Sequence, residues 1–382
     1  MTGKFITESS FAEGLEDVIA ASSEITFIDG LTGILAYRGY RIEELAQNAT
    51  FEEVTYLLWN ERLPNKAEYD DLNRQLAESH ALTPQVIQHI RNLPKTMHPM
   101  DALRTAVSVM AHYDPDVQDN SPESNRRKAI RLVAQTPSVV AAFDRIRNGK
   151  EPIPAKPGLR VAANFLYMLT GKEPDPISEK ALEVYLVLLA DHEFNASTFA
   201  ARVTAATLSD MHSAVVSGIG ALKGPLHGGA NEKTMELLLL IGDPDEAKEY
   251  VEGMLERKEK IMGIGHRVYK VRDPRTAELK KMSKAMCDVI GRPELYEMSE
   301  IIEQTVWDAK RLPANVDFYS ATVLYALGLN IDTFTPLFAV SRMSGWTAHV
   351  MEQHANNRII RPRAEYRGPE PGSRHYTPMN ER

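Results

Sequence analysis

The chain has 382 residues, and at ~150 residues per domain this length predicts two or three domains. Hydrophobic residues make up 43% and charged residues 25%, no apolar run approaches the ~18 residues of a membrane span, and the net charge of −8 argues against nucleic acid as the main partner, because such binding needs a basic surface. Cys287 is the single cysteine, so no intrachain disulfide can form, and we expect a reducing, cytoplasmic location with no membrane partner.

In chain order, the N-terminal segment predicts no secretory signal, because no basic stretch precedes an apolar one. Residues 25–37 then predict one short hairpin with a Gly-bearing turn. Beyond it, apolar residues recur at helical spacing, and helix starts are marked by a capping box at Thr50 and Glu53 and by Pro84 after Thr83. The fold class is therefore all-α with one hairpin. Polar, Pro-rich residues 114–126 and 149–158 predict surface loops.

The second half of the chain predicts two lobes. Residues 178–221 are rich in Ala, Val and Leu, which predicts buried central helices, with a hinge near residues 218–224. Charged amphipathic helices follow at 246–260 and 276–289, and an apolar helix returns at 333–352. We therefore predict a large domain over residues 1–222, a small domain over 223–322, and a return to the large domain with a C-terminal arm over 323–382. The Arg- and Pro-rich tail from Arg358 lacks helical periodicity, so we expect it to lie across a partner subunit.

Two of four candidate segments place a histidine where a ligand can approach. In residues 191–198, His192 lies within an apolar helical region, so a core histidine competes with a ligand contact. In residues 224–232, His227 precedes two glycines that have no evident packing role, and Asn231 is expected to cap the next helix. A plain turn with an incidental histidine is the alternative.

The other two segments add a third histidine, basic residues and an acid. Residues 263–275 combine a Gly-framed His266 with Lys270 and with Arg275 in an Asp-Pro-Arg run, and a solvated basic loop is the alternative. Residues 315–320 place Asp317 beside apolar and aromatic residues, where a helix-capping aspartate is the alternative.

Several other chemistries lack their motifs. His192 and Glu193 are not followed by the second histidine that a zincin helix needs, and one cysteine cannot build a thiolate site, so a metal is disfavoured. The chain has no Walker A motif and no GxSxG elbow. The glycines at 218, 220 and 224 miss the dinucleotide fingerprint by one position and lack a βαβ setting.

Jointly, the four segments resemble the citrate synthase family, and the resemblance covers most of the chain. The motifs occur in the family's order: IDG…YRGY at residues 28–40, HE with Asn at His192, GPLHGGAN at His227, GxGHxVY…DPR from His266 to Arg275, VD at Asp317, SR at Arg342 and RP at Arg361. Ile264 is a departure, since the family more often has an aromatic residue there. The resemblance implies a two-lobed helical fold whose cleft closes over its substrates.

The resemblance also implies the activity, an acyltransferase that condenses acetyl-CoA with oxaloacetate and hydrolyses citryl-CoA without a metal or redox cofactor. Asp317 is expected to take a proton from the acetyl methyl, His227 to stabilise the enol and His266 to polarise the ketone. Oxaloacetate is expected to meet four cationic or imidazole side chains, because guanidinium forks match carboxylates: His192, Arg275, Arg342 and Arg361. CoA is expected to contact Leu226, Ile261, Met262, Gly263, Lys270 and Asn315.

Three alternatives stay open at this stage. A 2-methylcitrate synthase, which accepts propionyl-CoA, resembles the chain throughout, although the segments around His227 and His266 favour the citrate enzyme. One methylene in a pocket changes binding by only ~1–3 kcal/mol, which leaves room for dual activity. A nicotinamide-dependent dehydrogenase and a non-catalytic helical scaffold are the alternatives from other classes. Arg361 matches a family arginine that reaches across a two-fold axis, which implies a homodimer with shared active sites.

Overall fold

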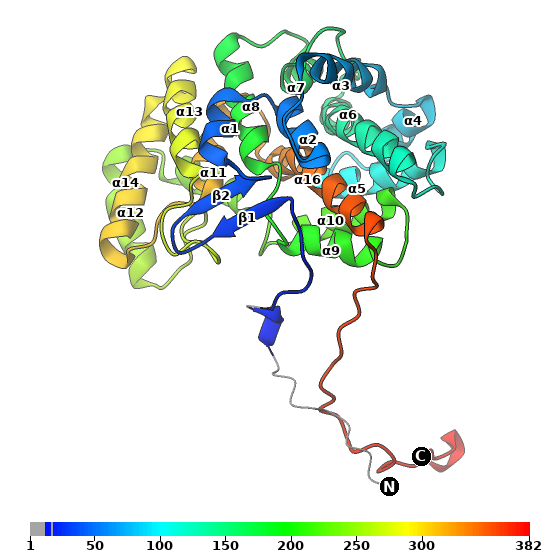
Figure 1. Cartoon of the computed structure of the whole chain (residues 1–382). Coiled ribbons are helices and arrows are strands. Elements are labelled where there is room, and N and C mark those ends of the chain that lie inside the picture. Colours follow the sequence, from blue (N-terminus) through cyan, green and yellow to red (C-terminus); the bar gives the residue numbers. More distant parts are fainter. Residues whose placement is uncertain (1–11, 17) are drawn as a thin grey trace.

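Helices dominate the part of the chain that the structure describes, residues 12–16 and 18–382. In these residues the computed structural model has sixteen α-helices (Figure 1). They are α1 (Ile42–Asn48), α2 (Phe51–Asn60), α3 (Lys66–Ser79), α4 (Pro84–Asn92), α5 (Pro99–Met110), α6 (Pro122–Arg147), α7 (Val161–Thr170), α8 (Pro176–Leu189), α9 (Ala196–Ala205), α10 (Met211–Leu222), α11 (Ala230–Ile241), α12 (Pro244–Glu256), α13 (Thr276–Val289), α14 (Pro293–Lys310), α15 (Val316–Ala326) and α16 (Phe334–Ala355). The predicted fold class is confirmed.

The predicted hairpin is also confirmed, with a short third strand added. Strands β1 (Thr26–Asp29), β2 (Ile34–Tyr37) and β3 (Tyr40–Arg41) form an antiparallel sheet in the order β1-β2-β3. The Asp29 carboxylate shapes the turn, because it accepts hydrogen bonds from the Leu31 amide at 2.8 Å and the Thr32 hydroxyl at 2.6 Å. Gly33 completes the turn with a φ of +70°, a conformation that favours glycine.

Helix starts follow the predicted capping chemistry. The Thr50 hydroxyl accepts from the Glu53 amide at 3.2 Å, and the Glu53 carboxylate accepts from the Thr50 amide at 2.7 Å, which is the reciprocal pair of a capping box. The Thr83 side chain caps α4 ahead of Pro84. One predicted loop is too long, because α6 begins at Pro122, so residues 122–126 are helical rather than irregular.

The core is centred on α16, the apolar helix predicted for residues 333–352. Its residues from Phe334 to Val350 are buried, and it packs against α2, α5, α6, α8, α9 and α10. Of the residues where a hinge is expected, 218–224, the first five belong to α10, which continues through Gly218 to Leu222, and the hinge stays a prediction. A methyl at Gly218 would lie 3.1 Å from the Trp346 ring, so this glycine permits close packing of α10 on α16.

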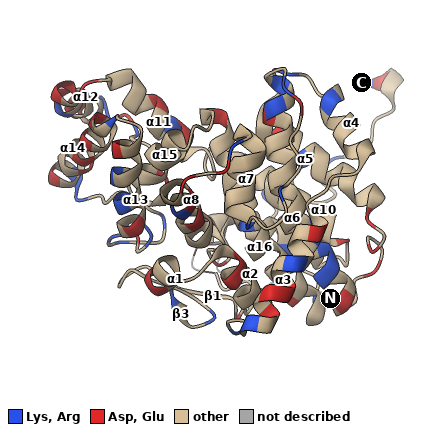
Figure 2. Cartoon of the chain, turned by 90° about the horizontal axis from the view of Figure 1, so that it is seen from above, with Lys and Arg blue, Asp and Glu red and all other residues tan. Residues whose placement is uncertain are grey.

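Helices α11 to α15 pack largely on one another and meet the rest of the molecule through α1, α8 and α16. Many of the charged residues lie on α12, α13 and α14, whereas α7 carries none (Figure 2). The boundary predicted after residue 222 coincides with the end of α10, and the one predicted after residue 322 falls inside α15. The division into two lobes stays a prediction. No helix in the described ranges is long and apolar enough to cross a bilayer.

Candidate active site

His227 lies in the loop that joins α10 to α11. The loop turns tightly at Gly228, where a methyl would overlap the carbonyl oxygen of Leu222, so only glycine fits. His227 Nε2 lies 2.9 Å from the hydroxyl oxygen of Ser197 on α9. Burial, with the nearby positive charge of Arg342, lowers the pKa of His227 to about 4, so the imidazole is neutral at physiological pH.

The cap predicted for α11 is wrong. Helix α11 begins at Ala230, one residue before Asn231, and the residue at the cap position is Gly229, which has no side chain to accept a hydrogen bond. Asn231 is therefore inside the first turn, where its side-chain oxygen accepts from the Glu232 amide at 2.8 Å.

His266 lies in the loop between α12 and α13. Its Nδ1 accepts hydrogen bonds from the backbone amides of Val268 at 3.0 Å and Tyr269 at 3.2 Å. A nitrogen that accepts carries no hydrogen, so the proton of the neutral ring is on Nε2. Burial, with the positive charge of Arg275, lowers the pKa of His266 to about 4. The side chain is therefore a neutral donor through Nε2.

Asp317 is the second residue of α15, and hydrogen bonds join the segment before α15 to the loop that carries His266. The Asn315 side chain caps α15 by accepting from the Asp317 amide at 2.9 Å and also donates to the Gly265 carbonyl at 2.7 Å. A further backbone bond runs from the Asn315 amide to the Gly263 carbonyl at 2.9 Å. These bonds fix the position of Asp317 relative to the loop that carries His266.

The Asp317 side chain is half-buried, and its Oδ1 is a buried atom with unmet hydrogen-bonding capacity. Its Oδ1 has no partner in the described chain. Burial is the largest influence on this group and raises the pKa of Asp317 to about 7, while the charges of Arg275 and Arg342 oppose the rise. A carboxyl group with this pKa exchanges a proton readily near neutral pH, as a general base must.

Two buried arginines act on these groups. Arg275 donates through Nε and Nη2 to the Asp273 carboxylate at 2.9 and 2.8 Å, and both side chains are almost fully buried. Arg342, 1% exposed, donates through Nε to the Leu189 carbonyl at 2.8 Å, and its Nη1 is buried without a partner in the described chain. An unmet guanidinium nitrogen is costly to bury, so it favours a site that receives an anion.

The expectation that His192 lies within a helical region is wrong, because this residue lies in the loop between α8 and α9. The ring is buried against the His266 loop, with its centroid 5.5 Å from that of His266. Its Nε2 lies 3.2 Å from the Tyr269 hydroxyl. Burial, followed by the charge of Arg275, holds the pKa of His192 well below its ordinary value. The two histidines predicted to meet oxaloacetate are thus neighbours.

Comparison with known proteins identifies the family to which the chain belongs. The family model described as "Citrate synthase, C-terminal domain" matches residues 14–363. Citrate synthase 2 of Bacillus subtilis is 52% identical over 97% of this chain and 98% of its own length. The chain belongs to the citrate synthase family. A solved citrate synthase from Pyrobaculum aerophilum matches it with a TM-score of 0.91 and 45% identity, over 100% of this chain and 98% of that chain.

Two more similar proteins bear on the ligands. A solved citrate synthase from Thermoplasma acidophilum, in ternary complex with carboxymethyl coenzyme A and oxaloacetate, matches with a TM-score of 0.91 and 32% identity, over 97% of this chain and 99% of that chain. A citrate/2-methylcitrate synthase of Bacillus subtilis is 43% identical over 94% of this chain and 97% of its own length. Like other citrate synthase family members, the chain is an acyltransferase.

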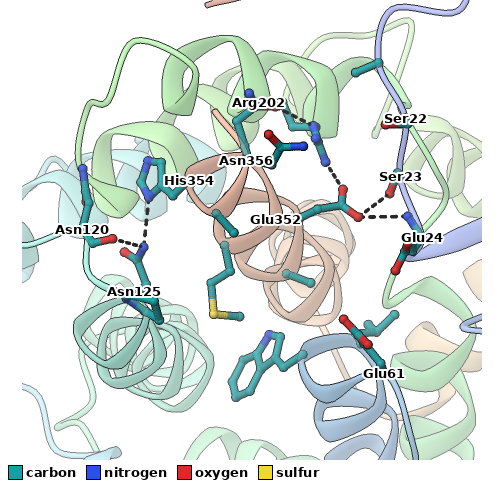
Figure 3. A pocket seen from close by; sticks show the side chains of 18 of the residues that line it. Ser22, Ser23, Glu24, Glu61, Asn120, Asn125, Arg202, Glu352, His354 and Asn356 are labelled. Carbon is teal, nitrogen blue, oxygen red and sulfur yellow. Dashed lines mark hydrogen bonds and ion pairs between the residues drawn. The ribbon is translucent and has the colours of Figure 1, made fainter. Parts of the chain in front are cut away.

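Arg361, which is predicted to bind oxaloacetate, lies apart from the other residues of this citrate synthase family chain that are predicted to do so. It is exposed in the segment that leaves the end of α16 and runs away from the helical body (Figure 1). It lies at the rim of a cavity of about 1230 Å³, whose lining contains none of the other predicted catalytic or oxaloacetate residues. Figure 3 shows this cavity, in which Arg202 and Glu352 form an ion pair.

The residues predicted to contact CoA lie in the loop that carries His227, in the loop that carries His266 and at the cap of α15. Some of them are exposed and some are buried. Leu226 is 94% exposed, whereas Ile261 is buried. The Met262 carbonyl accepts from the Thr234 hydroxyl at 3.1 Å, and Gly263 has a φ of +77°. Lys270 is exposed next to the hairpin, and its amide donates to the Gly30 carbonyl at 2.8 Å. Ile261, Met262, Gly263 and Lys270 thus lie in the loop that carries His266, and Asn315 hydrogen-bonds to the same loop.

Sequence reasoning missed three polar residues that hold the site together: Ser197, Asp273 and Trp346. Ser197 contacts His227 and accepts from the Trp346 indole at 3.2 Å. Asp273 pairs with Arg275 and accepts from the Val316 amide at 3.2 Å, which ties the arginine to the start of α15. Ser197 and Asp273 both lie inside motifs that the sequence singled out, but Trp346 had no local signal.

Proposed function

We propose that this chain is a citrate synthase, which condenses acetyl-CoA with oxaloacetate and hydrolyses citryl-CoA to citrate and CoA. The observation that carries the proposal is Asp317, a half-buried carboxyl group with a buried, unpartnered oxygen and a pKa raised to about 7. The methyl of a thioester is a weak acid, so its deprotonation needs a base of this kind together with stabilisation of the enolate that forms.

In the first step, Asp317 takes a proton from the acetyl methyl, and the electron pair of that C–H bond moves to form the enolate. His227 stabilises the developing negative charge on the thioester oxygen. Ser197 occupies Nε2 of His227 at 2.9 Å, so Nδ1 is the nitrogen available to the substrate. A neutral imidazole suits this task, because a pKa of about 4 leaves the ring uncharged at physiological pH and able to donate one hydrogen bond to the enolate oxygen.

In the second step, the enolate carbon attacks the ketone carbon of oxaloacetate and a carbon–carbon bond forms. The electron pair of the ketone C=O bond moves to its oxygen, which takes a proton from His266 Nε2. The proton that Asp317 removed in the first step then returns to the imidazole through solvent, which restores both groups. The tautomer supports this role, because the amides of Val268 and Tyr269 occupy Nδ1 and leave the hydrogen on Nε2. The product is citryl-CoA.

The carboxylates of oxaloacetate are bound by His192, Arg275, Arg342 and Arg361. The partnerless Nη1 of Arg342 supports this assignment, because a substrate carboxylate would satisfy it. Arg275 uses Nε and Nη2 on Asp273, which leaves Nη1 for the substrate and holds the guanidinium plane in place. Arg361 comes from the partner subunit of a homodimer, so each site is completed by the second chain.

In the last step, water adds to the citryl thioester, and the C–S bond breaks to release CoA as its thiol and citrate as the new carboxylate. CoA lies against Leu226, Ile261, Met262, Gly263, Lys270 and Asn315. No step of this scheme requires a metal or a redox cofactor. The cytoplasmic location stays a prediction that rests on the single cysteine.

Release of CoA thiol from acetyl-CoA and oxaloacetate, without added cofactor, tests the proposal. We expect kcat/KM for acetyl-CoA to exceed that for propionyl-CoA at least about tenfold, which corresponds to ~1.4 kcal/mol. The likeness to a citrate/2-methylcitrate synthase makes propionyl-CoA the relevant competitor. A larger kcat/KM for propionyl-CoA would reassign the chain as a 2-methylcitrate synthase, and absence of thiol release from either substrate would refute both.

A further inference from the structure

Tyr269 lies between the two histidines proposed to meet oxaloacetate, and the mechanism above gives its side chain no role. It is 2% exposed. Its ring centroid is 4.7 Å from that of His266 and 5.7 Å from that of His192. Its hydroxyl oxygen lies 3.2 Å from His192 Nε2, and its backbone amide lies 3.2 Å from His266 Nδ1. One residue therefore contacts a ring nitrogen of each histidine.

The proton positions of this cluster follow from burial. Burial raises the pKa of Tyr269, so its hydroxyl keeps its hydrogen at neutral pH. In the described chain, the hydrogen-bond partner of this hydroxyl is His192 Nε2, and a buried O–H that fails to donate is unfavourable. The hydroxyl therefore donates to Nε2. Since burial also keeps His192 neutral, the single ring hydrogen of His192 is on Nδ1.

We propose that Tyr269 is a positioning residue for oxaloacetate, whose hydroxyl fixes the tautomer and ring orientation of His192 so that Nδ1–H is the donor to a substrate carboxylate. The inference deepens the proposed function and rests on it. The same residue orients His266 through its backbone, so side chain and main chain of one position prepare two donors of complementary tautomer. The simpler reading is that Tyr269 is only an apolar filler between two rings.

Tyr269→Phe separates the two readings, because it keeps the ring and the backbone amide and removes only the hydroxyl. Without that hydroxyl, His192 no longer has a fixed hydrogen on Nδ1. A group that binds substrate equally in the ground and transition states affects KM rather than kcat. We expect KM for oxaloacetate to rise about five- to tenfold, while kcat and KM for acetyl-CoA change less than about twofold, as for loss of one hydrogen bond.

Tyr319→Phe is the matched control. Tyr319 is another fully buried tyrosine, and its hydroxyl donates to the Glu303 carboxylate at 2.6 Å, away from both histidines. We expect this variant to lower the unfolding temperature without raising KM for oxaloacetate. An unchanged KM for oxaloacetate in Tyr269→Phe, or an equal rise in Tyr319→Phe, would overturn the proposal.

Nitrogen-15 spectra of histidine-labelled wild-type protein test the tautomer without any variant at Tyr269. The signals of His192 are identified by their loss in His192→Asn. We expect a neutral ring with its hydrogen on Nδ1, and a hydrogen on Nε2 would contradict the inference. Failure of the proposed function is distinguishable, since wild-type protein would then neither bind oxaloacetate by calorimetry nor release thiol, whatever Tyr269 does.

Discussion

Burial shifts the pKa of Asp317 and the pKa values of His227 and His266 in opposite directions. Removing a charged group from water disfavours its charged form, so the pKa of Asp317 rises to about 7, whereas those of His227 and His266 fall to about 4. Between these values both imidazoles are neutral donors, and ionisation of Asp317 alone decides whether a base is present. We therefore expect the site to supply a base and two neutral hydrogen-bond donors at the same pH.

The pH profile follows from these directions. Asp317 accepts a proton only when ionised, so its raised pKa removes the base at low pH. We expect kcat/KM for acetyl-CoA, at saturating oxaloacetate, to rise with pH about tenfold per unit below 7 and to level above it. Ionisation of the histidines should not change the rate between pH 5 and 7, because their pKa values lie near 4. Steady-state rates that stay constant between pH 5 and 7, or that decrease as the pH rises over this range, would contradict this assignment.

Asp317→Asn removes the base and keeps its shape. We expect kcat to fall by about 10²- to 10⁴-fold, the range that general base catalysis contributes, while oxaloacetate binding changes less than about threefold. Calorimetry measures the binding, and deuterium exchange from the methyl of a non-reacting acetyl-CoA analogue measures deprotonation. Asp308→Asn on α14, an exposed aspartate, is the control and should be inert. Methyl exchange at the wild-type rate in Asp317→Asn would show that another residue is the base.

At the scale of elements, the close approach of α16 to the loop that carries His192 fixes the substrate site. A methyl at Gly345 would overlap the Ala190 carbonyl oxygen and the Asp191 carboxylate. That carboxylate is itself held by the Thr26 hydroxyl at 2.6 Å and by His349 Nε2 at 3.1 Å. The hairpin, α16 and the loop after α8 therefore meet at Asp191, the residue before His192.

Two glycine-to-alanine changes in helices separate packing from helix propensity. Gly345→Ala should lower the free energy of unfolding by about 1–3 kcal/mol, because the new methyl overpacks a buried contact. Gly220→Ala on α10, where the nearest atom lies 4.0 Å away, should raise it by about 0.5–1 kcal/mol, the helix preference of alanine. Urea unfolding of both variants measures the difference. Equal changes of the same sign would show that the contact at Asp191 does not constrain α16.

Local patterns predicted the elements whose causes are local. The capping box at Thr50 and the hairpin before Tyr37 are confirmed, because each depends on residues within a few positions. The loop around His192 was missed because its apolar neighbours are buried by α16 and the hairpin. Buried residues in a loop are as hydrophobic as buried residues in a helix, so the hydrophobic pattern did not distinguish the two. The cap at Asn231 was misplaced by two residues, since Gly228 and Gly229 already complete the turn.

The site was predictable in its parts but not in its assembly. Motifs identified His192, His227, His266 and Asp317, whereas the contacts that orient them join distant elements. Ser197 contacts a histidine thirty residues away, and Trp346 reaches Ser197 from α16. Such pairings depend on how helices pack, which hydrophobic spacing along one helix does not encode. Roles for the site residues, including those for CoA, stay predictions.

At the scale of the whole molecule, the C-terminal segment is difficult to explain in a single chain. After α16 it runs away from the body with its residues exposed (Figure 1), among them Tyr366 at 69% and Tyr376 at 83%. Exposed aromatic side chains on an extended segment are unfavourable in water and favour contact with a second copy. In a two-fold dimer, the segment of each chain is then able to bring Arg361 to the active site of the other.

Mixing two inactive variants tests this shared site. In a hybrid of an Asp317→Asn chain with an Arg361→Ala chain, the first chain supplies an intact Arg361 to the site whose Asp317 is intact, so one site in two is restored. Equal random pairing makes about half of the dimers hybrid, so about a quarter of wild-type activity should return. If Arg361 acted within its own chain, both sites of the hybrid would keep one defect. Co-refolded mixtures that show only the summed residual activities, with hybrids confirmed by mass spectrometry, would refute the shared site.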